Sequence, residues 1–552
     1  MGPIMPLALP KFRPARLAIA LAALALLLGG AAFSRFASAN DTADYPAASL
    51  TAPTDPAALI ARGKYLTTAA DCLPCHTGPN HAPFSGGLVM ATPFGGLATP
   101  NITPDKTTGI GNWTDRQFYN AVHYGVAPGR SYLLFPKFLY PAMPYTSYTK
   151  LSYADVMAIK AYLFSLPPVN VAPTPSTMLF PFNQRPVLLG WRILFFRSGP
   201  MHMDPNWTDS MKNGAYLTEA LGHCGECHTP RNILSAMMLD KAYAGAPIDA
   251  FFAPNISSDK QYGVGGWAQS DLVAYLHDDG NMVKGSPYAA MGEVVDNSTS
   301  QIPVSDDVDI ANYLQTMTAP QSVPPTPAIP GAAASIAMGA TVYTANCAGC
   351  HGQTGGGMAP IIPNLAGNNS VTASEPTNVI GAVLSGLDSW KANGPAMPAF
   401  ASSLSDEQIA AVANYVRTNF GNNATADATA HDVMELRGIA VVPPGANKEA
   451  DLFGCPHVSA AGGPTTVADP GSDLLNSYIG ATPATMPNRT RMLIAAIRAG
   501  NATISNADLT NDLIAAYCPV VANQAGLSRS AKHQAMLNFI ASAQPLINAT
   551  AN

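Results

Sequence analysis

Three short motifs of two cysteines and a histidine are the residues of this chain best suited to chemistry. Each has the spacing Cys-x-x-Cys-His, and they occupy residues 72–76, 224–228 and 347–351. Two thiols three positions apart can each form a thioether with a haem vinyl group, and the histidine that follows then lies beneath the iron. One such motif is also compatible with a redox dithiol or half of a zinc site. Three in one chain, each followed by a methionine that could serve as a distal ligand, favour haem attachment.

The motifs therefore predict three covalently bound haem c groups. The cysteines expected to form the thioethers are Cys72, Cys75, Cys224, Cys227, Cys347 and Cys350. The histidines expected to bind the iron from the proximal side are His76, His228 and His351. No motif for a dinucleotide or a phosphate loop accompanies them, so a catalytic site for substrate oxidation is not predicted in this chain.

A haem c that only transfers electrons needs a distal iron ligand, commonly a methionine. Met143 and Met397 each stand in a Pro-Ala-Met-Pro sequence, whose prolines would stiffen a loop that presents sulfur to iron. The second motif lacks such a sequence; Met291 is the predicted ligand there, and Met282 is its rival. Methionine is also a common core filler. Four further histidines are alternative ligands, or more simply surface and supporting residues: His81, His123, His223 and His277.

The chain repeats itself around the first two motifs. Five residues recur at one constant offset, as Asn101, Asp105, Gly109, Gly111 and Trp113 and then as Asn255, Asp259, Gly263, Gly265 and Trp267. Upstream of each motif the sequence Gly-x-Tyr-Leu-Thr also recurs, over residues 63–67 and 214–218. Such self-similarity predicts two paralogous units.

All three motif-bearing segments are expected to close on a helix. Helical spacing of apolar residues predicts these helices over 154–163, 306–314 and 406–416, with serines at or just before their starts. Those serines, Ser152, Ser305 and Ser405, could cap free backbone N–H groups. Proline-rich stretches that follow the first and second segments predict extended connectors.

We accordingly expect a mainly α-helical chain of three tandem cytochrome c domains plus a C-terminal extension, after an N-terminal signal peptide. The expected ranges are a signal peptide at 1–39, domains at 50–170, 200–318 and 331–420, and the extension at 421–552. In the extension, two helical segments are expected around 492–499 and 531–543.

Export is predicted from the N-terminus. Basic residues precede an apolar run over 17–33, and Ala-Ser-Ala at 37–39 has the small-residue pattern of a signal-peptidase site. An uncleaved membrane anchor is the alternative, because the run approaches the length of a short span. In an oxidising compartment the two remaining cysteines, Cys455 and Cys518, are expected to form a disulfide; two unrelated buried thiols are the alternative.

Composition narrows the choice of partners. Only 12% of the 552 residues are charged and 47% are hydrophobic, which fits a chain that covers part of its surface with partners or a membrane. The net charge is −6 without a basic tract, so nucleic acid is not an expected partner. In the segment 180–196, arginines alternate with Leu, Phe and Trp, which is typical of a bilayer interface or, equally, of a linker packed on the domains.

Several of these runs resemble one family. Residues 101–111 and 140–145 look like the first domain of the triheme cytochrome c subunits of membrane-bound dehydrogenases in acetic acid bacteria. Residues 222–232 resemble their second haem site, and 363–368 with 397–400 resemble their third. The resemblance implies a subunit on the periplasmic side of the inner membrane that takes electrons from a catalytic dehydrogenase subunit and delivers them to ubiquinone.

The resemblance leaves the catalytic partner open. In this family the partner carries PQQ, flavin, or a molybdenum cofactor with a small iron–sulfur subunit. The long region after 421, with residues 253–256 and 296–300, inclines the expectation towards the molybdenum aldehyde-oxidising type. Two alternatives of another kind are a peroxidase-like enzyme with one open iron site, and a freely diffusing electron carrier.

Overall fold

The computed structural model describes residues 55–131, 135–248, 251–319, 326–387, 397–440, 485–500, 506–522 and 529–549, with residues 478, 502, 504 and 524. The chain forms two compact units. Unit 1 comprises the residues up to 226 with 231–236 and 293–313; unit 2 comprises 227–230, 237–292 and 314 onwards. The predicted signal peptide and Cys455 lie outside the described residues.

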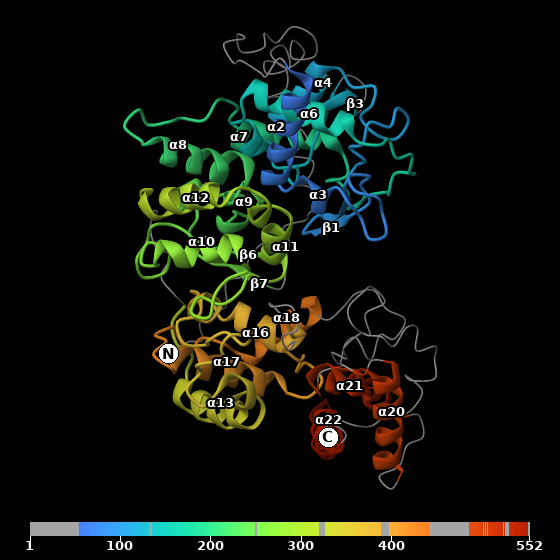
Figure 1. Cartoon of the computed structure of the whole chain (residues 1–552), viewed down its shortest axis with the longest axis vertical. Coiled ribbons are helices and arrows are strands. Elements are labelled where there is room, and N and C mark those ends of the chain that lie inside the picture. Colours follow the sequence, from blue (N-terminus) through green and yellow to red (C-terminus); the bar gives the residue numbers. More distant parts are fainter. Residues whose placement is uncertain are drawn as a thin grey trace, which may run out of the picture. The chain divides into compact units, whose positions relative to one another are not determined.

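Most elements of unit 1 are helices (Figure 1). They are α2 Pro56–Ala69, α3 Cys72–Cys75, α4 Asp115–Tyr124, α5 Tyr145–Tyr148, α6 Tyr153–Ser165, η2 Arg185–Val187, α7 Leu188–Phe195, α8 Asp209–Tyr216, the π-helical turn η3 Leu217–Leu221 and η5 Thr299–Gln301. Its short strands pair antiparallel as β1 Val89–Thr92, β2 Gly95–Ala98 and β5 Thr177–Met178 in one sheet, and β3 Val126–Arg130 with β4 Pro136–Phe138 in another.

Unit 2 is also helical. Its elements are η4 Leu239–Lys241, β6 Ala246–Ile248, β7 Phe251–Ala253, α10 Gln269–His277, α13 Ala332–Asn346, α14 Ala348–His351, α15 Asn369–Thr372, α16 Thr377–Ser385, α17 Asp406–Thr418, α18 Ala430–Ala440, α20 Met486–Gly500, α21 Asn506–Ala522 and α22 Arg529–Ala549. Three helices contain residues of both units: α9 Gly225–His228, α11 Ala290–Asn297 and α12 Val304–Thr316. The predicted mainly α class is therefore confirmed. None of the described helices is long and apolar enough to cross a membrane.

The predicted closing helices are present as α6, α12 and α17. Ser152 and Ser405 cap α6 and α17, because each hydroxyl accepts from the backbone N–H three residues later. In α17 the cap is reciprocal, since the Gln408 side chain accepts from the Ser405 N–H. Ser305 differs: α12 already begins at Val304, so this serine lies inside the first turn.

Each closing helix meets an earlier helix at a glycine. A Cβ on Gly63 would lie 1.9 Å from the Ala158 carbonyl oxygen, one on Gly214 would lie 1.9 Å from that of Asp309, and one on Gly339 would lie 2.0 Å from that of Ala411. The tyrosines four residues after these carbonyls, Tyr162, Tyr313 and Tyr415, would have their own Cβ atoms 2.8, 3.0 and 2.6 Å from the same added Cβ atoms. The same backbone-to-backbone crossing therefore occurs upstream of all three cysteine motifs.

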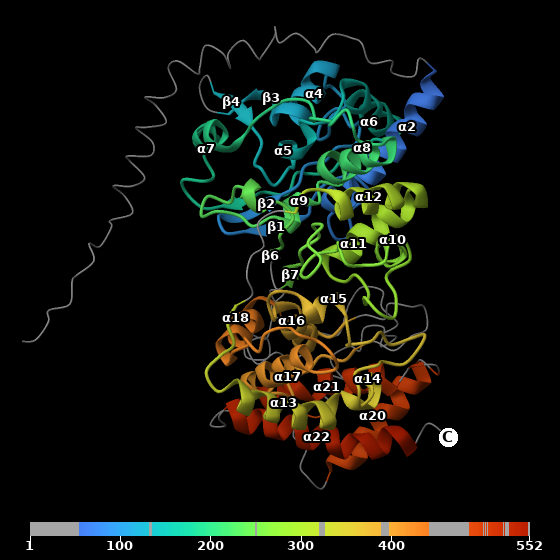
Figure 2. The same ribbon diagram turned by 90° about the vertical axis from the view of Figure 1, so that its left-hand side faces the viewer.

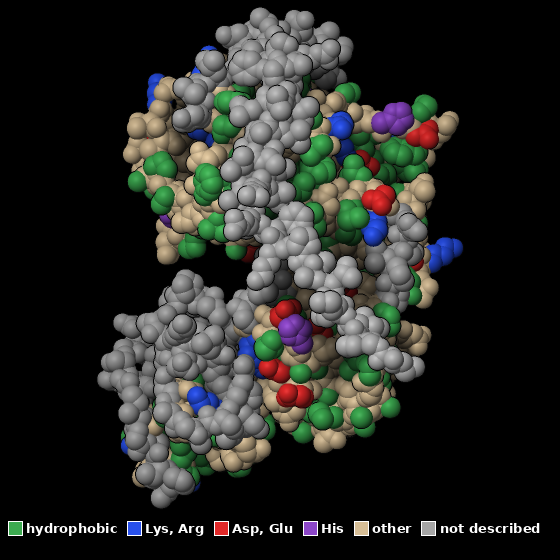
Figure 3. All heavy atoms as spheres, turned by 180° about the vertical axis from the view of Figure 1, so that it is seen from behind, with side chains coloured by type: hydrophobic (Ala, Val, Ile, Leu, Met, Phe, Trp, Pro, Cys, Tyr) green, Lys and Arg blue, Asp and Glu red, His purple; other side chains and the backbone are tan. Residues whose placement is uncertain are grey.

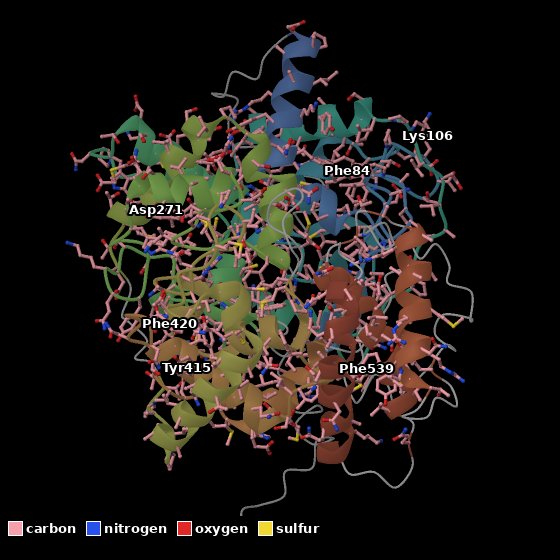
Figure 4. All side chains as sticks on the ribbon, turned by 60° about the horizontal axis from the view of Figure 1, so that its bottom comes forward. Phe84, Lys106, Asp271, Tyr415, Phe420 and Phe539 are labelled. Carbon is pink, nitrogen blue, oxygen red and sulfur yellow. The ribbon has the colours of Figure 1, made fainter. Side chains whose placement is uncertain are left out.

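The third crossing is centred on α13 and α17, which lie side by side in unit 2 (Figure 2). Their shared core includes Tyr343, Ile380 and Ile409, all almost fully buried. Tyr415 and Phe420, labelled in Figure 4, stack edge to face at 5.5 Å between ring centroids, and Tyr343 contacts both rings. Buried aromatic pairs of this kind fix the crossing geometry beyond what area burial alone supplies.

The C-terminal extension has its own core. Tyr478, Leu509, Leu513 and Phe539 are buried with residues of α20, α21 and α22. The expected helices appear as α20 and α22, whereas α21 was not predicted; Pro519 lies inside it. Cys518 is fully buried in α21, but its predicted partner Cys455 lies outside the described residues, so the disulfide stays a prediction.

The helix crossing gives a direct stability test. Gly339→Ala places a methyl group 2.0 Å from a backbone oxygen that cannot rotate away, so we expect a loss of about 3 kcal/mol in the free energy of unfolding. Gly190→Ala is the control: it lies in α7 with nothing within 4 Å, so the extra methyl should be neutral or slightly stabilising. Chemical unfolding followed by circular dichroism measures both. Equal stability of the two variants would contradict the crossing.

Candidate haem-attachment sites

Each cysteine motif sits at a short helix that follows the crossed glycine helix. The helices are α3, α9 and α14. In the first and third motifs one cysteine is partly buried and the other exposed, whereas both are partly buried in the second. A helical turn places residues three apart on one face, so both thiols of a motif can reach a single planar ligand.

Proline carbonyls accept hydrogen bonds from the histidines of the first two motifs. His76 Nδ1 lies 2.8 Å from the Pro100 oxygen, and His228 Nδ1 lies 2.6 Å from the Pro254 oxygen. A carbonyl can only accept, so Nδ1 carries the proton and Nε2 keeps its lone pair for a metal. In the third motif, burial lowers the pKa of His351 and the Pro363 carbonyl opposes that shift, but His351 Nδ1 makes no hydrogen bond of full geometry.

Two of these carbonyls are fixed by one repeated loop. Asn101 Oδ1 accepts from the backbone N–H of Thr103 (2.9 Å) and from its hydroxyl (2.7 Å). Asn255 Oδ1 accepts from Ser257 in the same two ways, at 2.8 and 2.7 Å. Both asparagines are buried and come directly after the proline, so the side-chain bonds set the direction of the carbonyl before them.

The other backbone contacts of this loop also recur in both repeats. The Ile110 N–H donates to Thr103 (2.9 Å), and the Val264 N–H donates to Ser257 (2.9 Å). A Cβ on Gly109 or Gly263 would lie 2.2 or 2.3 Å from those same acceptor carbonyls, which explains the glycine at this position of both repeats. The sequence repeat is therefore a repeat in three dimensions.

Burial keeps the motif histidines neutral. Loss of solvation lowers the pKa of His76, His228 and His351, and the facing proline carbonyls oppose this effect. A neutral imidazole is the form that binds a metal ion. Burial also raises the pKa of the Cys72 and Cys347 thiols to about 12. At these two thiols the raised pKa gives no sign of the activated thiolate that a redox dithiol needs.

Sequence reasoning missed the proline carbonyls, although a signal exists. All three motifs are followed by Pro-Asn and then Ile or Leu, at residues 100–102, 254–256 and 363–365. The asparagines were noted as part of the repeat, but backbone acceptors carry no residue type and so escape a search for ligating side chains.

The predicted distal methionines lie in unlike settings. Met143 is partly buried in a tight turn: its N–H donates to Tyr140, and its carbonyl accepts from Tyr145 (2.7 Å). Met397 pairs with Leu387 through two backbone bonds, and its side chain packs on the same core as Cys347. A predicted thioether cysteine and a predicted distal ligand of the third site therefore both border one hydrophobic core.

The second site keeps two methionine candidates. Met291 lies in the first turn of α11, a helix rather than the proline-stiffened loop of the other two. Met282 lies in the turn bridged by Asn281 and Gly285, and its carbonyl accepts from the Asn364 N–H (2.8 Å). Both side chains are partly buried, so the geometry does not separate them.

Among the alternative histidines, His123 has the clearest environment. Its ring stacks on Tyr119 at 4.7 Å between centroids, and burial lowers its pKa to about 4. It is thus a neutral member of the core between α4 and its neighbours. His223 contacts Tyr148 edge to face at 5.6 Å. Among the described residues no group of three or more His, Cys, Asp or Glu side chains is placed to hold a metal ion by itself.

The segment 180–196 combines features of both expected roles. Arg192 is buried, and its guanidinium lies over the rings of Phe138 (4.9 Å) and Phe196 (4.7 Å), as a packed linker requires. Phe180 is 77% exposed and Leu194 is 59% exposed, as a contact surface requires. One side of the segment therefore packs on unit 1, and the other leaves large apolar side chains outside.

Charged side chains do not gather into a basic surface on the described part of the face in Figure 3, where they are scattered among hydrophobic and neutral ones. This agrees with the low charge fraction and the net charge of −6.

Comparison with known proteins identifies the class. The cytochrome c family matches residues 336–420. The chain is 35% identical over 412 residues to the cytochrome c subunit of a quinone alcohol dehydrogenase of Gluconacetobacter polyoxogenes, covering 70% of this chain and 85% of that protein. It is 37% identical over 410 residues to the fructose dehydrogenase cytochrome subunit of Gluconobacter japonicus, covering 68% and 82%.

A third relative extends further. The gluconate 2-dehydrogenase cytochrome c subunit of Pantoea cypripedii is 35% identical over 438 residues, which is 75% of this chain and 94% of that protein. The chain therefore belongs to the family of dehydrogenase cytochrome c subunits. Membership implies covalently bound haem c, a role in electron transfer and a catalytic dehydrogenase partner.

Proposed function

We propose that this protein is a triheme electron-transfer subunit that carries electrons from a catalytic dehydrogenase subunit to ubiquinone. The observation that carries the proposal is the threefold recurrence of one arrangement. A glycine helix crosses a closing helix, a Cys-x-x-Cys-His motif follows the glycine helix, and a proline carbonyl faces the motif histidine. We assign the three tandem cytochrome c domains to residues 50–170, 200–318 and 331–420 on this basis.

In this proposal each domain holds one haem c, which supplies one-electron redox chemistry when bound. The two cysteines of each motif would hold one haem covalently, and His76, His228 and His351 would each present Nε2 to one iron. Met143, Met291 and Met397 are the proposed distal ligands. The chain's own task is to fix the imidazoles, exclude water from the sites and set the approach between neighbouring domains.

The catalytic partner is proposed only by class. The relatives are cytochrome subunits of alcohol, fructose and gluconate dehydrogenases, which are named for different substrates. Each is named as the cytochrome subunit of a dehydrogenase, which supports a separate subunit that oxidises the substrate. A molybdenum aldehyde-oxidising partner with an iron–sulfur subunit remains a distinct outcome of the experiment below.

We further propose that the protein works on the periplasmic side of the inner membrane. The apolar run at 17–33 and the Ala-Ser-Ala signature support export. Leu179, Phe180 and Leu194 support contact with a bilayer, since they are exposed apolar side chains, and the exposed Arg197 just beyond the segment can meet lipid headgroups.

Purification of the native complex tests this function. We expect the chain to stay with membranes washed in high salt, to be released by detergent, and to co-purify with a cofactor-bearing subunit that reduces ubiquinone when its substrate is added. PQQ, flavin or molybdenum in that subunit decides the substrate class. Recovery of this chain alone in the salt wash, with no quinone reduction, would contradict the proposal and favour a free carrier.

The distal ligand of the second haem is tested by a pair of variants. Met291→Ala should remove the sulfur-to-iron absorption band of one haem and leave the bands of the other two. Met282→Ala is the matched control, because it shortens the rival methionine and keeps its backbone bond to Asn364. A normal spectrum for Met291→Ala with a lost band for Met282→Ala would transfer the assignment to Met282.

A further inference from the structure

Two aspartates on the closing helices of the first two domains are held in the same unusual way. Asp155 accepts from Arg62 Nε on Oδ1 (3.1 Å) and from the Tyr216 hydroxyl on Oδ2 (2.7 Å). Asp306 accepts from Asn213 Nδ2 on Oδ1 (3.1 Å) and from the Tyr65 hydroxyl on Oδ2 (2.8 Å). All six residues belong to unit 1.

The two sets of hydrogen bonds are reciprocal: the tyrosine of each repeat bonds to the aspartate of the other repeat. Tyr65 and Tyr216 occupy the same place in the repeated Gly-x-Tyr-Leu-Thr sequence, and Asp155 and Asp306 occupy the same place in the closing helices α6 and α12. In each set Oδ1 is bonded by the aspartate's own domain, and Oδ2 is bonded by the tyrosine of the other domain. Such mutual exchange is the signature of an isologous interface, here formed within one chain.

Contacts beyond the tyrosines follow the same exchange. Helix α5 of the first domain packs on η3 of the second, while α2 of the first packs on η5 of the second. Lys150 adds an ion pair with Glu219 (2.7 Å). The paralogous repeats are therefore packed against each other as two copies of a subunit would be.

This interface brings together the segments that lead into the first and the second cysteine motif. The Tyr148 hydroxyl donates to the Ala70 carbonyl (2.9 Å), and its ring contacts His223 at 5.6 Å. Ala70 lies two residues before Cys72, and His223 lies directly before Cys224. Ser298 reaches the same stretch, because its hydroxyl donates to the Ala69 carbonyl (3.3 Å).

We propose that the reciprocal bonds Tyr65–Asp306 and Tyr216–Asp155 are a positioning clamp that holds the segments leading into the first two haem motifs, a neighbouring pair along the chain, against each other. Tyr65, Tyr216, Asp155 and Asp306 are positioning residues: they act through the packing of the two domains and do not touch the reacting atoms. Passing one electron across the pair oxidises one site by one electron and reduces the other by one, with no bond made or broken. The inference rests on the proposed function, since it requires a haem at each of the two motifs.

The chemistry of the bonds suits a permanent clamp. Burial raises the pKa of both tyrosines, and the carboxylate that each one meets raises it further, so both phenols stay protonated and remain donors. A phenol that donates to a carboxylate forms a charge-assisted bond, which is stronger and more directional than a neutral one. The clamp therefore does not switch with pH in the physiological range.

The experiment compares Tyr65→Phe, Tyr216→Phe and the double variant with the wild type in the full holo-protein. Phenylalanine keeps the ring and removes only the donor. Tyr140→Phe is the matched control, since it removes a hydroxyl bond to the Phe182 carbonyl (2.7 Å) within the same unit but outside the clamp. Three readouts are used: haem content, the bisignate Soret circular dichroism that arises from two haems held close in one orientation, and the rate of electron exchange between the two sites.

We expect full haem content in all variants, a reduced Soret couplet in each single variant, and loss of more than half of the couplet in the double variant. The rate of electron exchange between the two sites should fall at least tenfold in the double variant and stay unchanged in Tyr140→Phe. An unchanged couplet and exchange rate in a fully loaded double variant would overturn the clamp.

A second variant covers the case in which the double variant does not fold. Asp306→Asn keeps the size of the side chain and weakens the bond from Tyr65, so it should reduce the couplet to the level of Tyr65→Phe; a wild-type couplet in Asp306→Asn would overturn the clamp. Absence of haem from the first or second motif of the wild type would instead contradict the proposed function itself, so the two failures are separable.

Discussion

The close crossing of two helices at a glycine is the constraint on which the rest of this structure depends. At Gly63, Gly214 and Gly339 the helix backbones approach so closely that a single methyl group would overlap a carbonyl oxygen. A short motif helix, α3, α9 or α14, follows each of these crossed helices in the chain. The crossing is made of backbone and glycine, so it tolerates wide variation elsewhere, which is how three copies can diverge in sequence and keep one arrangement.

A second constraint builds on the first. The motif histidine is usable by a metal only if its ring is oriented and its proton sits on the nitrogen away from the iron. Proline carbonyls at 100, 254 and 363 face Nδ1, and in two repeats a buried asparagine fixes the carbonyl in turn. The glycine crossing, the motif helix and the proline loop therefore follow one another in the first two repeats. The hydrogen bonds from Tyr65 to Asp306 and from Tyr216 to Asp155 link these two repeats to each other.

The sequence alone predicted the parts of this arrangement that depend on which side chains are present. The three motifs, the repeat around Asn101 and Asn255, and the closing helices with the Ser152 and Ser405 caps follow from residue types and spacing. The contacts of the proline carbonyls could not be predicted, because every residue carries the same backbone acceptor. The reciprocal Tyr–Asp bonds could not be predicted, because they depend on how the two repeats pack. Helix α21 was missed because Pro519 within it is typical of a helix end. The signal peptide, the disulfide and the domain limits remain predictions.

The account as a whole claims that one arrangement occurs three times and that each copy holds a haem. Intact mass spectrometry of the native protein, paired with a haem assay, tests that claim most directly. The account predicts a mass increase of three covalently attached haems, with one attached to each peptide that carries residues 72–76, 224–228 and 347–351. A protein with two haems or fewer, or a motif peptide with free thiols in the native protein, would contradict it.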